Sequence, residues 1–180
     1  MNQNAKPAAA TSGVRWRVLG WGTAAVLLAA PLVAMRFTRE VNWDGADFLF
    51  AGIMFAAIGG LLELAVRLSR NRAYRAGFAV AVLGGFLTVW SNLAVGIVGN
   101  EDNPFNFWFF GVLAVGLVGA LIARGQAGGM ALTMGIASAA QVGLFAFASA
   151  LQTASAWPVL FFLPFWFASA ALFARAAQEG

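Results

Sequence analysis

The chain has 180 residues, of which 61% are hydrophobic and only 10% are charged, and its formal net charge is +4. Soluble globular domains carry about 25% charged residues, so this composition indicates a membrane protein with little room for a separate soluble domain. Because the sequence contains no cysteine and no histidine, it lacks the usual ligands of haem, copper, structural zinc and iron–sulfur clusters, and we expect no cofactor and no metal.

Six apolar segments of about 18 to 24 residues follow one another along the chain. As an α-helix, each is long enough to cross about 30 Å of hydrocarbon. The short turns between them hold nearly all the charged residues. The pattern predicts an all-α, polytopic membrane protein, a bundle of six transmembrane helices within one domain, residues 14–180. The predicted helices are about 15–36, 47–69, 76–98, 106–124, 130–151 and 157–176.

The N-terminal residues 1–13 are polar, small and aperiodic, which predicts a cytoplasmic tail that is disordered or docked on a partner. Arg15 and Arg17 precede an apolar run, so a secretory signal is an alternative, with a weak cleavage-like triplet at 32–34. The apolar run 18–35 is longer than the hydrophobic region of a typical signal peptide. We therefore interpret it as an uncleaved first helix.

The charges separate by sign when the segments are read as alternating crossings. Such asymmetry is the positive-inside signature, so we expect both termini in the cytoplasm. The basic residues on the N-terminal side are Lys6, Arg15, Arg17, Arg67, Arg70, Arg72, Arg75, Arg124 and Arg175. The acids on the opposite side are Glu40, Asp44, Asp47, Glu101 and Asp102. No basic stripe alternates with aromatic residues, so we expect no nucleic-acid partner.

Glu63 is the one acidic residue that the pattern places within a membrane span. Carboxylates inside a membrane are costly and often functional, so Glu63 is the first candidate for proton or cation transport. Arg67 follows four residues later, and on a helix the two side chains would meet near the cytoplasmic end. We favour a helix-end ion pair.

The acidic side also collects asparagines, and together these residues offer many oxygen ligands of the type that Ca²⁺ or Mg²⁺ prefers. The candidate rim consists of Asp44, Asp47, Glu101 and Asp102, with Glu40, Asn42, Asn100, Asn103 and Asn106 beside them. No EF-hand or similar ligand spacing is present. Arg36 and Arg39 lie on the same side, so we favour a rim of structural salt bridges over a metal site.

Polar residues within the predicted bundle are few and fall mainly on the third and fifth segments. Asn92 lies on the third, and Gln141 shares a helical stripe of the fifth with Ser138, Ser149 and Gln152. One interpretation is a polar substrate path between these two helices. We favour the other, interhelical hydrogen bonding, which membrane bundles use routinely at modest energy.

Small residues recur every fourth position at Gly52, Ala56 and Gly60, and again at Gly116 and Ala120, a spacing that favours close helix packing. Aromatic residues at the ends of the segments are typical of an interfacial belt. The sixth segment carries aromatic bulk all around the helix. It would face lipid, a partner helix or a lipophilic ligand such as a pigment or quinone, and lipid exposure is our default expectation.

Residues 90–106 read W-S-N-L-A-V-G-I-V-G-N-E-D-N-P-F-N, close to an N-R-A-Y-R turn at 71–75. This string resembles a segment of a group of small bacterial inner-membrane proteins, and the resemblance covers the second to fourth helices. It implies a bacterial inner (cytoplasmic) membrane protein. That group has no established activity, so the resemblance implies no chemistry.

These observations favour a non-catalytic integral membrane protein over an enzyme, because no convergent pair of carboxylates is visible. We expect an accessory or structural subunit, or a lipid-facing scaffold, that acts through helix packing. Its expected partners are the lipid bilayer and either a membrane-protein complex or further copies of the chain. The alternative is a small ion or solute carrier or channel that uses Glu63 and the polar positions of the third and fifth helices.

Overall fold

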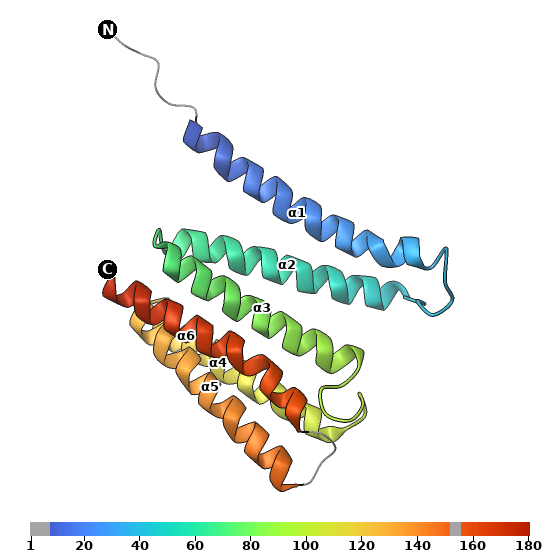
Figure 1. The fold of residues 1–180 in the computed structure, drawn as a ribbon. Helices are drawn as coiled ribbons and strands as arrows, with labels where there is room; N and C mark the ends of the chain where they lie inside the picture. Colours follow the sequence, from blue (N-terminus) through green and yellow to red (C-terminus); the bar gives the residue numbers. More distant parts are fainter. Residues whose placement is uncertain (1–7, 152–155) are drawn as a thin grey trace. The chain divides into compact units, whose positions relative to one another are not determined.

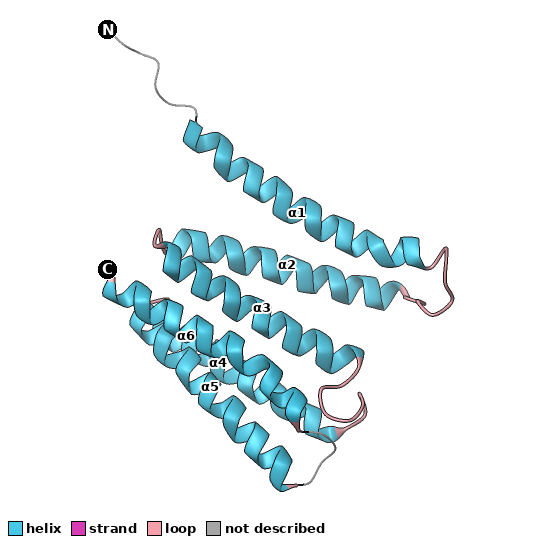
Figure 2. Cartoon of the chain, in the orientation of Figure 1, coloured by secondary structure: helices cyan, strands magenta, loops and turns pink. Residues whose placement is uncertain are grey.

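The computed structural model describes residues 8–151 and 156–180, with side chains described from residue 17 onward. Six helices in these ranges are long and apolar enough to cross a membrane, which confirms the prediction of six such helices. Across the same ranges the secondary structure is helix, turn and loop, without a strand (Figure 2).

The elements follow in the order α1 (Ala8–Ala34), α2 (Gly45–Leu68), α3 (Arg72–Ala94), η1 (Pro104–Phe107), α4 (Trp108–Ala123), α5 (Ala127–Ala150), η2 (Trp157–Phe162) and α6 (Leu163–Gln178) (Figure 1). The short 3-10 helices η1 and η2 lead directly into α4 and α6, and each pair forms one candidate span. Pro104 and Pro158 lie in the first turns of η1 and η2, where a missing N–H is tolerated. Pro164, predicted to kink the sixth helix, instead lies at the start of α6, where 3-10 geometry changes to α.

Four helices begin earlier than predicted: α1, α2, α3 and α5. α3 begins at Arg72 instead of residue 76, because Asn71 caps it inside the segment predicted as a turn. α1 begins at Ala8, inside the segment predicted as a polar tail, because three consecutive alanines are strong helix formers. α5 begins at Ala127 and includes Gly129 in its first turn. A Cβ at Gly129 would lie 2.7 Å from the Cβ of Ala123, so glycine permits the tight α4–α5 turn.

The third helix ends earlier than predicted. It was expected to reach residue 98 but stops at Ala94. Gly96 adopts a left-handed φ of 71°, and a side chain there would collide with the backbone of Asn100. Residues 95–103 therefore form a folded loop, the α3–η1 loop, instead of a last helical turn.

The contacts divide the chain into two compact units, Met1–Gly60 and Leu61–Gly180. In the first unit, α1 meets α2 at two glycines. A Cβ at Gly59 would lie 2.8 Å from Cη2 of Trp21, and one at Gly52 would lie 4.0 Å from Leu28. Of the small stripe predicted on α2, Gly52 faces α1, whereas Ala56 and Gly60 are exposed.

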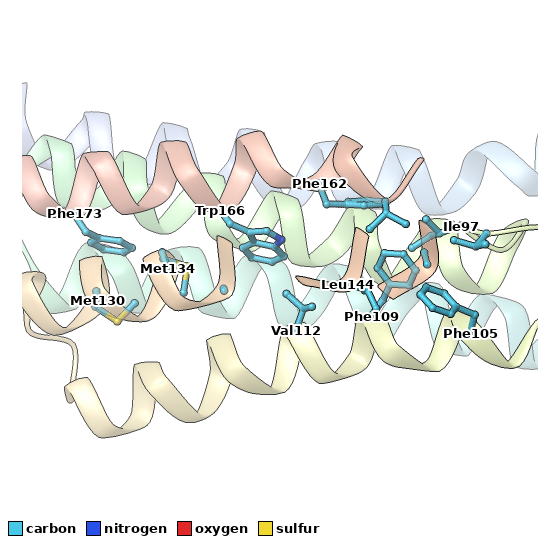
Figure 3. Close-up of a cluster of buried hydrophobic side chains, with 14 of the residues drawn as sticks. Ile97, Phe105, Phe109, Val112, Met130, Met134, Leu144, Phe162, Trp166 and Phe173 are labelled. Atoms are coloured by element: carbon cyan, nitrogen blue, oxygen red, sulfur yellow. The ribbon is translucent and has the colours of Figure 1, made fainter. Parts of the chain in front are cut away.

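In the second unit, α6 packs against both α3 and α5, and α5 packs against α4. Short turns make these neighbours antiparallel, which gives the up-and-down pattern of a four-helix bundle (Figure 1). The buried hydrophobic core lies here, and Figure 3 shows Phe173, Trp166 and Phe162 spread along its length. Ring contacts join the helices at both ends: Tyr74 meets Phe173 at a centroid distance of 5.0 Å, and Phe109 meets Phe162 at 6.1 Å.

Glycines set the closest approach between α3 and α6. A Cβ at Gly84 would lie 2.7 Å from the Cβ of Phe165, and one at Gly77 would lie 3.2 Å from the Cβ of Leu172. The hydroxyl of Ser169 donates a hydrogen bond of 2.8 Å to the carbonyl of Gly77. This glycine pair, seven residues apart, is a packing face of the kind that membrane helices use.

The expectation that the sixth helix is plainly exposed to lipid is wrong for one of its faces. Phe161 and Phe167 are exposed, as expected. A continuous stripe is buried instead, at alternating spacings of four and three that keep it on one side of the helix. The stripe consists of Phe162, Trp166, Ser169, Phe173 and Ala176.

Candidate functional site

The structure places Glu63 and Arg67 one turn apart on α2, near its C-terminal end. Their side chains form an ion pair with 3.7 Å between Nη2 of Arg67 and Oε2 of Glu63. The Glu63 side chain is 29% exposed and that of Arg67 is 72% exposed, so the pair lies at the helix surface. This geometry is that of a helix-end ion pair, which was the interpretation we favoured.

Asn92 belongs to a buried amide cluster that holds the α3–η1 loop. Its Nδ2 donates a hydrogen bond of 2.8 Å to the backbone carbonyl of Asn106. The Asn106 side chain is 3% exposed; its Oδ1 accepts from the backbone N–H of Val98 at 2.9 Å and of Ile97 at 3.2 Å. Its Nδ2 donates to the carbonyl of Asn100 at 2.7 Å and to that of Val98 at 3.4 Å. Asn106 was expected beside an acidic rim and is instead the centre of this loop.

Gln141 is fully buried on α5 and connects that helix to the sixth span. Its Nε2 donates a hydrogen bond of 2.6 Å to the carbonyl of Val159 in η2. Its Oε1 accepts from the indole Nε1 of Trp166 on α6 at 3.3 Å. Gln141 therefore bonds to the sixth span, whereas Asn92 bonds to η1. α6 packs against both α3 and α5. The two residues proposed for a polar path are each used to hold the bundle together.

The hydroxyl groups of the bundle bond to helix backbone. Thr88, Thr133, Ser138 and Ser149 each donate to the carbonyl four residues earlier, at 2.8–2.9 Å. Gln152, the last member of the predicted stripe, lies outside the described residues. Among the described residues, every buried side-chain nitrogen and oxygen has a hydrogen-bond partner.

The predicted acidic rim divides into parts with different roles. Oδ1 of Asp44 accepts hydrogen bonds from the backbone N–H groups of Ala46 at 2.7 Å and Asp47 at 3.0 Å. Oδ2 of Asp47 accepts in return from the N–H of Asp44 at 2.9 Å. This reciprocal pattern is a capping box at the start of α2.

Glu101 and Asp102, the other two acids of the rim, are exposed in the α3–η1 loop. Within the described ranges, no group of three or more acidic residues is placed to hold a metal ion. Arg36 and Arg39, expected to pair with rim acids, form no ion pair with another described residue.

The opposite end of the second unit is basic, and we call it the arginine end. It comprises Arg67, Arg70, Arg72, Arg75, Arg124 and Arg175. Asn71 caps α3 by accepting from the N–H of Tyr74 at 3.0 Å, and its Nδ2 donates to Glu179 at 3.0 Å. Hydrogen bonds from Arg175 and then Asn71 hold the pKa of the Glu179 carboxyl below its ordinary value.

A groove between α4 and α5 has a volume of about 230 Å³. It is open, and apolar side chains line it, with Trp108 and Phe147 at one end. These two rings meet edge to face at 5.7 Å. A groove of this composition offers no polar path for an ion or a hydrophilic solute.

Sequence reasoning missed two structural roles that had a readable signal. Asp44 and Asp47 stand three residues apart at the start of an apolar run, which is the signature of a capping box. The glycine pair of α3 is spaced by seven residues, which keeps both on one helix face. The contact between the Tyr74 hydroxyl and the Gly125 carbonyl, at 2.8 Å, had no such signal, because its partners come from distant turns.

Comparison with known proteins adds no family to this description: no protein-family model, no curated protein and no solved structure matches the chain.

Proposed function

We propose that this chain is a non-catalytic protein of the bacterial inner membrane, an accessory or structural subunit that acts through helix packing. Both termini are proposed to lie in the cytoplasm, and the bilayer together with a membrane-protein complex is the proposed setting. The resemblance of residues 90–106 and the six candidate spans support this location.

The observation that carries the proposal is the use of the buried polar side chains. Asn92, Asn106 and Gln141 bond to backbone carbonyls, backbone amides and an indole of the chain itself. A carrier or an enzyme needs polar groups that are free to meet a substrate. In this bundle the buried polar groups instead fix the positions of η1, η2 and α6.

The first unit supports a role in docking to another membrane protein. None of the side chains in the span Arg17–Ala34 of α1 is buried. On α2, Ala56 and Gly60 are exposed, and the space in front of Gly60 is open. In a bilayer such small residues allow another helix to approach closely, so this face suits a partner helix.

The distribution of charge supports the proposed orientation. The arginine end gathers the α2–α3 turn, the α4–α5 turn and the end of α6 on one side of the second unit. The α3–η1 loop at the other side carries Glu101 and Asp102. By the positive-inside rule, the arginine end faces the cytoplasm. A tag at the C-terminus should therefore be accessible from the cytoplasmic side of the membrane only.

A flux assay on Glu63→Gln tests this proposal against the carrier alternative. We expect proteoliposomes with the wild-type chain to pass protons and monovalent cations no faster than protein-free vesicles. Because Glu63 serves as a surface ion pair, Glu63→Gln is expected to leave this background unchanged.

Glu179→Gln is the matched control, because it removes the acid of another ion pair with i,i+4 spacing, Arg175–Glu179. Flux through the wild-type chain that Glu63→Gln abolishes and Glu179→Gln preserves would establish a carrier and overturn the proposal.

A further inference from the structure

The arginine end is built from three separate chain segments that are held together. The hydroxyl of Tyr74, in the first turn of α3, donates a hydrogen bond of 2.8 Å to the carbonyl of Gly125 in the α4–α5 turn. A Cβ at Gly125 would lie 3.4 Å from Cδ1 of Leu68, at the end of α2. Asn71 binds Glu179 beyond the end of α6. These contacts place the two turns and the α6 terminus at one end (Figure 1).

Half of the six arginines at this end already have partners. Arg67 pairs with Glu63, and Arg175 pairs with Glu179 at 2.7 Å. Arg75 donates from Nε to the carbonyl of Ser69 at 2.8 Å and from Nη2 to that of Val66 at 3.2 Å, so it closes the C-terminal end of α2. These three guanidinium groups are used within the chain.

The remaining three, Arg70, Arg72 and Arg124, are exposed and form no ion pair with another described residue. Arg124 has a left-handed φ of 50°, which is unfavourable for a residue with a side chain. The bond between Tyr74 and Gly125 holds the turn in this shape. It places the backbone of this turn, which includes Arg124, against the first turn of α3, the helix that begins at Arg72.

The surroundings of these arginines combine charge with hydrocarbon. Leu121 and Ile122, in the last turn of α4 before Arg124, are 70% and 76% exposed. Leu68, before Arg70, is exposed as well. All three arginines stand at the ends of candidate membrane spans, at the level where phospholipid headgroups lie.

We propose that Arg72 and Arg124, with Arg70 beside them, bind the phosphate of an anionic phospholipid whose acyl chains lie along the end of α4. Guanidinium groups bind phosphate through paired, charge-assisted hydrogen bonds. The excess of positive charge at this end complements an anionic headgroup, and basic residues at the cytoplasmic surface attract such lipids. The exposed leucine and isoleucine beside Arg124 favour a lipid over free phosphate, because free phosphate has no apolar part to cover them.

The test measures lipid binding to the full chain, purified in a non-ionic detergent, by native mass spectrometry with phosphatidylglycerol and phosphatidylcholine. We expect the wild-type chain to bind phosphatidylglycerol about tenfold more tightly than phosphatidylcholine, with a preference that falls as salt is raised. The double variant Arg72→Gln/Arg124→Gln is expected to lose this preference.

Two further variants keep the result interpretable. Arg36→Gln/Arg39→Gln removes the same charge from two exposed arginines of the α1–α2 loop and is expected to change the preference less than about twofold. Arg72→Lys/Arg124→Lys keeps the charge but not the paired guanidinium hydrogen bonds. It is expected to fold and to weaken the preference about threefold, which decides the question if the glutamine pair does not fold. Equal affinity for the two lipids, or an equal loss in the Arg36/Arg39 variant, would overturn the proposal. Displacement of the lipid by millimolar inorganic phosphate or by an acidic peptide would overturn the assignment to a lipid.

Discussion

Asn106→Leu is expected to destabilise the chain by about 2–4 kcal/mol, the largest effect among the single substitutions considered. Leucine has the same number and branching of side-chain heavy atoms as asparagine but cannot accept from the N–H groups of Ile97 and Val98, which are buried in the α3–η1 loop. A buried donor left without an acceptor costs about 1–3 kcal/mol, and this substitution strands two of them. The carbonyl of Val98 keeps a partner, since Asn103 also donates to it at 2.9 Å.

The measurement is the unfolding free energy in mixed micelles, followed by helicity and tryptophan fluorescence as a denaturing detergent is added. Asn100→Leu is the matched control, because Asn100 is exposed in the same loop and uses only its backbone carbonyl in the cluster. Its free energy is expected to stay within about 0.5 kcal/mol of wild type. Equal effects of the two substitutions would show that the amide cluster does not hold the loop.

Gln141→Leu is expected to cost about 2–3 kcal/mol. The substitution leaves the carbonyl of Val159 and the indole N–H of Trp166 without their partner in a buried site. Neither group can reach water unless η2 or α6 moves. The sixth span should therefore pack less tightly against α5, in addition to the loss of unfolding free energy. Trp166 fluorescence should therefore shift toward the red before the rest of the bundle unfolds.

Gln126→Leu provides the comparison for Gln141→Leu. Gln126 stands just before α5, is exposed and makes no side-chain cap to the helix. The same chemical change there is expected to alter the unfolding free energy by less than about 0.5 kcal/mol. A Gln141→Leu protein as stable as Gln126→Leu would contradict the role assigned to Gln141, and a polar path through this part of the bundle would regain support.

The six spans could be predicted because length and hydropathy are local properties of the sequence. The arginine end could also be predicted, because consecutive helices joined by short turns run antiparallel, so every second turn lies on the same side. Gln141 was predicted inside the bundle from its stripe with Ser138, and the structure buries both. What the stripe could not supply was the partner, because Val159 and Trp166 are brought to Gln141 by tertiary packing.

The loop after α3 shows where such reasoning stops. Asn100, Asn103 and Asn106 look alike in sequence, yet only Asn106 becomes buried. The difference arises because Gly96 breaks the helix and turns two backbone amides toward one side chain, which no periodicity reports. The buried face of α6 was missed for another reason. Its repeat of four and three is present, but Phe161 and Phe167 on the other face conceal it.

The capping box of α2 was available from the sequence, but its two acids were interpreted as part of a rim of structural salt bridges. Asp44 and Asp47 carry the spacing of a box, and each satisfies backbone N–H groups of the helix start. Two carboxylates engaged in this way have fewer free lone pairs for a cation. The positions of Asp44 and Asp47 relative to the helix start therefore predicted their role better than the number of acids on that side did.

The subunit role is tested most directly by purifying the tagged chain at native expression in a gentle detergent and quantifying the bound proteins by mass spectrometry. We expect one or more other membrane proteins to remain bound in a fixed ratio through the face of α2 that carries Ala56 and Gly60. Recovery of the chain alone, as a monomer or bound only to further copies of itself, would contradict the proposal that it serves as a subunit of a larger membrane complex.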